Sequence, residues 1–166
     1  QVFKKNEQHA EPNNWIEENS WLIPTEISYE VPFKHFTLTS KLDRVDILGY
    51  KKESKNYLNL FDIQALNYNL IETGIEFDKT KIKENLTLFL YPDDSDKNGE
   101  LLRIYQQYFM VSNAAQLLID EAIERGSNLH DLADYAYVQI NDTHPSMVIP
   151  ELIRLLTKKH HLKFDE

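Results

Sequence analysis

The sequence VQINDTHPSMVIPEL, residues 138–152, joins an apolar run to a helical pattern through a short polar loop. Residues 135–140 (YAYVQI) form a compact aromatic and apolar run, which predicts a strand. Residues 147–160 predict a helix that begins near Ser146, because Pro150 is tolerated only in a first turn. The expected unit is therefore strand–loop–helix. The predicted apolar face of its helix consists of Ile149, Leu152, Ile153 and Leu156.

The loop of this unit, residues 141–144, carries hydrogen-bond donors and acceptors suited to sugar hydroxyls. In open sheets flanked by helices, ligands bind beyond the carboxyl ends of the strands, so this position favours a binding role for Asp142 and His144. The residues alone leave a structural alternative. In it, Asp142 and Thr143 are turn and N-cap residues, and His144 is an ordinary loop histidine.

A second polar loop precedes a long helix. The apolar run at residues 86–90 predicts a buried strand, which ends at the Pro- and Asp-rich residues 91–96. Arg103 lies near the start of the following helix, where positive charge is unfavourable. We therefore expect a partner for Arg103, such as Asp93 or Asp94. The alternative is a capped helix with a local ion pair and no binding role.

The long helix is predicted over about 25 residues, or about 37 Å at 1.5 Å per residue. It should end at Gly126 in a left-handed C-cap. Apolar positions recur along it at spacings of three and four, which indicates one buried face. That face comprises Leu101, Tyr105, Tyr108, Ser112, Ala115, Leu118 or Ile119, and Ala122.

The chain before residue 90 is expected to form smaller elements. Residues 1–26 predict a polar leading segment. Period-two alternation between residues 27 and 62 predicts short antiparallel strands with a turn at residues 49–52. Residues 78–86 predict a short exposed helix. The expected fold class is α/β, more closely α+β, with the strands followed by the long helix and the strand–loop–helix unit.

Charge and composition exclude several classes of protein. The 166 residues include 27 acidic and 18 basic side chains, a net charge of −9 that argues against a nucleic-acid partner. The absence of cysteine excludes disulfides, thiolate zinc sites and cysteine nucleophiles. The chain has neither a run of ~18 apolar residues nor an apolar N-terminal signal region. We therefore expect a cytoplasmic protein without membrane contact.

Residues 139–156 (QINDTHPSMVIPELIRLL) resemble the signature of the glycogen and maltodextrin phosphorylases. Three further segments agree in the same order, namely residues 14–21, 90–109 and 128–135. The resemblance covers about residues 12–166. It implies that residues 27–166 are an interior part of the N-terminal lobe of a two-lobed glycosyltransferase several times longer than this chain.

The resemblance also implies an activity. Family members use phosphate to cleave a terminal α-1,4-glucosidic bond of glycogen or maltodextrin, and they release glucose 1-phosphate with retention at the anomeric carbon. They are homodimers, and they carry pyridoxal phosphate on a lysine of the C-terminal lobe. That lysine and the phosphate-binding residues lie downstream of this segment. The resemblance thus implies that the chain contains no catalytic, cofactor-binding or metal-binding residue and is inactive when isolated.

Substrate-binding residues are implied at matching positions. Asp142 and His144 resemble loop residues that line the glucose positions, and Tyr91 resembles the aromatic residue that meets the glucan. Asp94 lies in a segment similar to the family's mobile gate loop, and Arg103 resembles the basic residue behind that loop.

Two features of the match concern the gate loop and the dimer. The family usually has Asn at the positions of Asp93 and Ser95, so a carboxylate and a hydroxyl replace two amides here. The charged residues 78–86 are similar in position to a helix that makes dimer contacts in the family.

Two other functions stay open from the residues alone. One is a non-catalytic carbohydrate-binding or assembly module that uses Tyr91 and the long helix. The other is a metal-dependent hydrolase around Asp142 and His144, which elemental analysis would contradict by finding no stoichiometric metal. The adjacent His160 and His161 do not favour a shared metal, since neighbouring side chains on a helix point about 100° apart.

Overall fold

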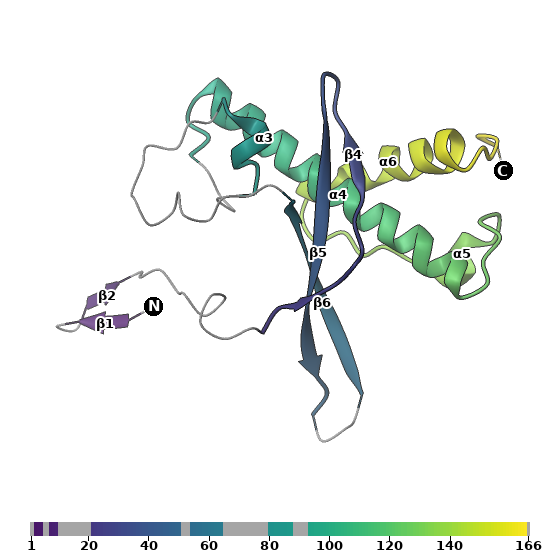
Figure 1. Ribbon diagram of the computed structural model, residues 1–166, viewed down its shortest axis with the longest axis horizontal. Coiled ribbons are helices and arrows are strands. Elements are labelled where there is room, and N and C mark those ends of the chain that lie inside the picture. The colour runs from purple at the N-terminus through teal and green to yellow at the C-terminus, as the bar shows by residue number, and fades with distance from the viewer. Residues whose placement is uncertain are drawn as a thin grey trace. The chain divides into compact units, whose positions relative to one another are not determined.

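The computed structural model divides into two compact units (Figure 1). The first unit contains Gln1–Ile27 and Leu42–Leu60, and the second contains Ser28–Lys41 and Phe61–Glu166. The residues that the structure describes are 2–4, 7–9, 21–50, 54–64, 80–87 and 93–165.

The first unit is built from short antiparallel pairings. β1 (Val2–Lys4) pairs with β2 (Glu7–His9). β3 (Ile23–Pro24) pairs with the second half of β5 at Arg44 and Asp43. Sequence alternation predicts antiparallel strands only between residues 27 and 62. The structure therefore has additional paired strands before residue 27.

β5 (Thr37–Leu48) pairs antiparallel with β4 (Glu30–Pro32) and also pairs with β6 (Lys55–Ile63). The backbone N–H of Gly49 donates to the carbonyl of Ser54 at 2.9 Å and closes the connection between β5 and β6. The predicted turn therefore begins where expected, and residues 51–53 lie outside the described residues. The prediction of antiparallel strands in this region is confirmed.

The long helix α4 (Lys97–Glu124) has 28 residues, and both of its ends follow from the sequence. The Asp96 side chain caps its N-terminus by accepting a hydrogen bond from the backbone of Gly99. Its C-terminus is a Schellman motif. The backbone N–H of Ser127 donates to the carbonyl of Ala122, and Gly126 has φ of 104°. The predicted end at Gly126 is confirmed.

α4 packs onto the sheet of the second unit through polar as well as apolar side chains. The Ser40 hydroxyl donates to Asn113 Oδ1 at 2.6 Å, and both side chains are fully buried. Tyr29 donates from its hydroxyl to Asp120 at 2.9 Å. The predicted buried face is correct in the second half of α4, where Ser112, Ala115, Ile119 and Ala122 are buried. In the first half Leu101 is exposed and the two tyrosines of the face are half-buried, while Leu102 and Phe109 are buried instead.

The predicted strand at residues 135–140 is wrong. The short helix α5 (Leu132–Tyr135) comes first, and residues 136–140 belong to no strand among those the structure describes. Tyr137 is 87% exposed. An apolar run becomes a strand only where a neighbouring strand supplies hydrogen-bond partners, and the described residues supply none.

The final helical segment is less regular than predicted. It begins with the 3₁₀ turn η1 (His144–Met147), continues as α6 (Val148–Arg154) and ends in the π-helical turn η2 (Leu155–Lys159). In that last turn the backbone N–H of His160 donates to the carbonyl of Leu155 at 3.0 Å. Pro150 lies in the first turn of α6, as expected.

The predicted apolar face of this segment is half wrong. Ile149 and Ile153 are exposed, while Leu152 and Leu156 pack against the core. Val148, Glu151 and Leu155 are buried instead, so the inward face of the segment is rotated away from the predicted one. The core cluster that α6 and η2 join contains Val111, Ala115, Ile119, Leu129, Val148 and Leu155.

The predicted short helix and buried strand before α4 are only partly described. The helix α3 (Ile82–Asn85) has four residues. Leu86 is fully buried, but it lies with Thr87 in a turn rather than a strand. Residues 88–92 lie outside the described residues.

Candidate functional site

The loop before η1 owes its shape to Asp142. Its φ of 70° is in the left-handed region, which Asp tolerates better than most residues because its short side chain bonds the local backbone. Oδ1 of Asp142 accepts a hydrogen bond from the backbone N–H of Thr143 at 2.6 Å. Thr143 stands at the N-cap of η1 without a side-chain capping bond.

Asp142 and His144 lie together at the surface. Oδ2 of Asp142 is 3.4 Å from Nε2 of His144, and the two side chains are 62% and 52% exposed. The backbone N–H of Thr143, followed by the His144 ring, lowers the pKa of Asp142 below its ordinary value. An ionised carboxylate and an imidazole are thus accessible to a ligand, and neither is sealed in an apolar interior.

The second nitrogen of His144 meets a side chain that sequence reasoning missed. Nε2 of Gln107, on α4, lies 3.2 Å from Nδ1 of His144. The sequence signal that could have found it is spacing, because Gln107 follows Arg103 by one helical turn.

Arg103 has the partner that its unfavourable position predicts. Its guanidinium donates to Oδ2 of Asp94 at 2.6 Å. Arg103 and Gln107 lie one helical turn apart on α4, so Asp94 and His144 contact side chains of the same helix face. Four of the five predicted substrate-binding residues thus form two pairs, Asp94 with Arg103 and Asp142 with His144. The fifth, Tyr91, lies outside the described residues.

Asp93 and Ser95 bond to each other. The backbone N–H and the hydroxyl of Ser95 donate to the two carboxylate oxygens of Asp93 at 3.1 and 3.0 Å. This turn orders the start of the loop by local hydrogen bonds. The two departures from the family pattern are thus coupled in the structure.

The loop at Asp93 and Asp94 packs directly on Gly99. A Cβ at residue 99 would lie 2.1 Å from the carbonyl oxygen of Asp93 and 2.8 Å from Cα of Asp94. Both are backbone atoms, so only movement of the loop relieves the clash.

We expect Gly99→Ala in the full-length protein to destabilise the start of α4 by about 1–3 kcal/mol, which is typical of overpacking. Hydrogen exchange of the first-turn amides of α4 measures the effect, and Asn98→Ala at the adjacent exposed position is the control. Equal exchange in both variants would contradict the close packing of this loop.

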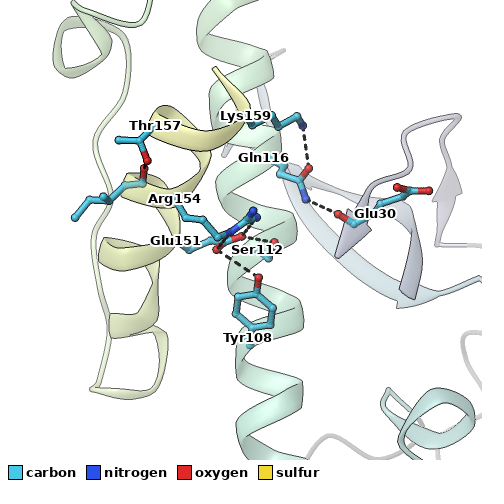
Figure 2. A network of polar contacts seen from close by, with 9 residues as sticks. Glu30, Tyr108, Ser112, Gln116, Glu151, Arg154, Thr157 and Lys159 are labelled. Carbon is cyan, nitrogen blue, oxygen red and sulfur yellow. Dashed lines mark hydrogen bonds and ion pairs between the residues drawn. The ribbon is translucent and has the colours of Figure 1, made fainter. Parts of the chain in front are cut away.

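A buried carboxylate joins α6 to α4 (Figure 2). Glu151 is 3% exposed, and it accepts hydrogen bonds from Ser112 at 2.6 Å and from two nitrogens of Arg154 at 2.7 and 2.8 Å. Burial, together with the charge of Glu151, raises the pKa of the nearby Tyr108. The network fixes α6 on α4, and α6 follows directly from the turn that carries His144.

An open cavity of about 480 Å³ adjoins this network. Its lining includes Arg154, Lys158 and Lys159. Arg154 is occupied by Glu151, and Lys159 donates to Gln116 at 3.0 Å, as Figure 2 shows. Two of its three cationic side chains are thus already engaged within the protein.

The described part of the chain does not provide a metal or cofactor centre. No group of three or more His, Asp or Glu side chains within it could hold a metal ion. None of the lysines whose burial the structure describes is buried, whereas a lysine that forms a Schiff base is typically desolvated. The described residues therefore do not fit a pyridoxal phosphate attachment site. Among those same residues, no helix is long and apolar enough to span a membrane.

Comparison with known proteins identifies the class. A family model described as carbohydrate phosphorylase matches residues 1–166. The chain is 66% identical over 159 residues to the maltodextrin phosphorylase of Streptococcus pneumoniae, covering 96% of this chain and 21% of that protein. It is 39% identical over 126 residues to the glycogen phosphorylase of Synechocystis sp., covering 71% of this chain and 15% of that protein.

This chain therefore belongs to the carbohydrate phosphorylase family, and the resemblance carried by residues 139–156 is confirmed. A plant relative, the H isozyme of alpha-glucan phosphorylase from Solanum tuberosum, is 30% identical over 196 residues, covering 100% of this chain and 23% of that protein. The chain thus spans between 15% and 23% of the length of these three relatives.

Proposed function

We propose that this chain forms part of the substrate-binding region of an α-1,4-glucan phosphorylase that releases glucose 1-phosphate from maltodextrin or glycogen. The observation that carries the proposal is the exposed pair of Asp142 and His144, which contacts α4 through Gln107, one helical turn from the Arg103 that pairs with Asp94. In the proposal the chain lies in the N-terminal lobe of a two-lobed enzyme. The names of the relatives support the substrate class.

The chemistry explains why such a site is useful. Cleavage of a glycosidic bond passes through an oxocarbenium-like transition state, which develops positive charge on the sugar. The Asp142 carboxylate stays ionised because of the Thr143 N–H, so it can accept sugar hydroxyl hydrogen bonds and stabilise that charge. Exclusion of water favours phosphorolysis over hydrolysis. The gate loop around Asp94 would contribute to that exclusion.

The full-length enzyme would supply what this chain lacks. Pyridoxal phosphate would be bound to a lysine outside this chain. The assembled enzyme would be a cytoplasmic homodimer. The cofactor, the dimer and the location are proposed from the family. The role proposed for the described residues is limited to binding the sugar.

Phosphorolysis assays test the proposal. The full-length protein, incubated with maltoheptaose and inorganic phosphate, should release glucose 1-phosphate, and the isolated chain should release none. The absence of product from pyridoxal phosphate-loaded full-length protein would contradict the proposal. Saturable binding of maltoheptaose to the isolated chain, measured by isothermal titration calorimetry, would instead favour a carbohydrate-binding module.

A further inference from the structure

We propose that Gln107 is a positioning residue that sets the ring orientation and the tautomer of His144. The inference rests on the proposed role of His144 in binding glucose. It adds a second residue from α4, after Arg103, to the proposed site.

The contacts of the imidazole favour one tautomer of the neutral ring. Nδ1 of His144 lies 3.2 Å from the amide nitrogen of Gln107, and Nε2 lies 3.4 Å from the carboxylate of Asp142. An amide nitrogen only donates, so Nδ1 accepts with its lone pair and the ring hydrogen of the neutral form is on Nε2. The carboxylate of Asp142 lies on the Nε2 side of the ring. Each ring nitrogen therefore has a polar side chain next to it.

The amide of Gln107 suits both protonation states of the ring. Rotated by half a turn, its oxygen accepts a hydrogen bond from the Nδ1–H of an imidazolium. Glutamate at this position would only accept, and would therefore favour the forms that carry a hydrogen on Nδ1, above all the imidazolium beside two carboxylates. Leucine would neither donate nor accept, and would leave Nδ1 without this partner.

The support for Gln107 is rigid. It lies on a 28-residue helix that is capped at both ends and fixed to α6 by the buried network around Glu151. A binding group is held most accurately when its partner lies on such an element rather than on another loop. Gln107 also lies one turn from Arg103, so α4 orients both halves of the proposed site.

The test uses the full-length enzyme with ¹⁵N-labelled histidine, and it compares Gln107→Leu with Gln106→Leu. Gln106 is the matched control because its amide donates to the carbonyl of Leu86 at 2.8 Å, away from His144. The ¹⁵N spectrum of His144 should show the Nε2–H tautomer in the parent and in Gln106→Leu, and a mixture of tautomers in Gln107→Leu. We expect kcat/KM for phosphorolysis to fall about tenfold in Gln107→Leu alone.

A second variant keeps the test decisive if Gln107→Leu folds poorly. Gln107→Glu preserves the shape of the side chain and should shift the His144 ring toward the doubly protonated form. An unchanged ring spectrum in both Gln107 variants would overturn the positioning role. A changed tautomer with unchanged kcat/KM would support the positioning role and contradict the proposed glucose contact of His144.

Discussion

Asp142→Asn and His144→Ala in the full-length protein are each expected to lower kcat/KM for phosphorolysis of maltodextrin by about 100-fold, as loss of a charge-stabilising group in an active site typically does. Asparagine tolerates the left-handed backbone of residue 142, so Asp142→Asn removes the charge while it keeps the loop. His144→Ala removes the imidazole and leaves Asp142 without its ring partner.

Steady-state kinetics with maltoheptaose and inorganic phosphate measure these losses. Asp134→Asn and His130→Ala are matched controls, because they make the same substitutions at exposed positions of the adjoining segment. Both controls should retain activity within about twofold, since surface substitutions away from such sites usually have small effects. Full activity of Asp142→Asn would remove Asp142 from the site, and full activity of His144→Ala would remove His144.

Arg154→Met is expected to destabilise the junction of α6 with α4 by about 3 kcal/mol. The reason is that Glu151 would remain as a buried charge without its cationic partner, which is the costly way to break a buried ion pair. The Arg154 side chain is 38% exposed, so we place the effect at the lower end of the usual range.

Native-state hydrogen exchange of the α6 amides in the full-length protein measures this local opening free energy. Arg125→Met is the matched control, because Arg125 forms a similar intrahelical pair with Glu121 but is 59% exposed. Its effect should stay below about 0.5 kcal/mol. Equal exchange protection in the two variants would show that the Glu151 network does not hold α6 in place.

The parts of the fold that the sequence predicts correctly depend on local signals. The strand pairing around β5 follows from period-two alternation and a turn at Gly49. The end of α4 follows from Gly126, because glycine readily adopts the positive φ that a Schellman motif requires. The Asp94–Arg103 pair follows from the helix dipole. Each signal is contained within a few residues of the feature that it predicts.

The wrong predictions concern features that depend on contacts between residues far apart in the sequence. Residues 135–140 have the composition of a strand, but a strand needs a partner that this run does not find among the described residues. Glu151 and Arg154 have the spacing of a surface ion pair, and only packing against Ser112 buries the carboxylate. The one clue was Ser112 itself, a polar residue within the predicted apolar face of α4.

The π-helical turn η2 after α6 changes which residues of this segment lie opposite residues of α4. On α4, Ser112 and Gln116 are four residues apart, and their partners Glu151 and Lys159 are eight apart. In a regular α-helix, residues eight apart would diverge by about 80° around the axis. Bonding from residue 155 to residue 160 absorbs this difference like a one-residue insertion, so deletion of one residue there would turn the lysine away from its glutamine. The number of residues in this turn, and not side-chain chemistry alone, therefore determines that Lys159 reaches Gln116.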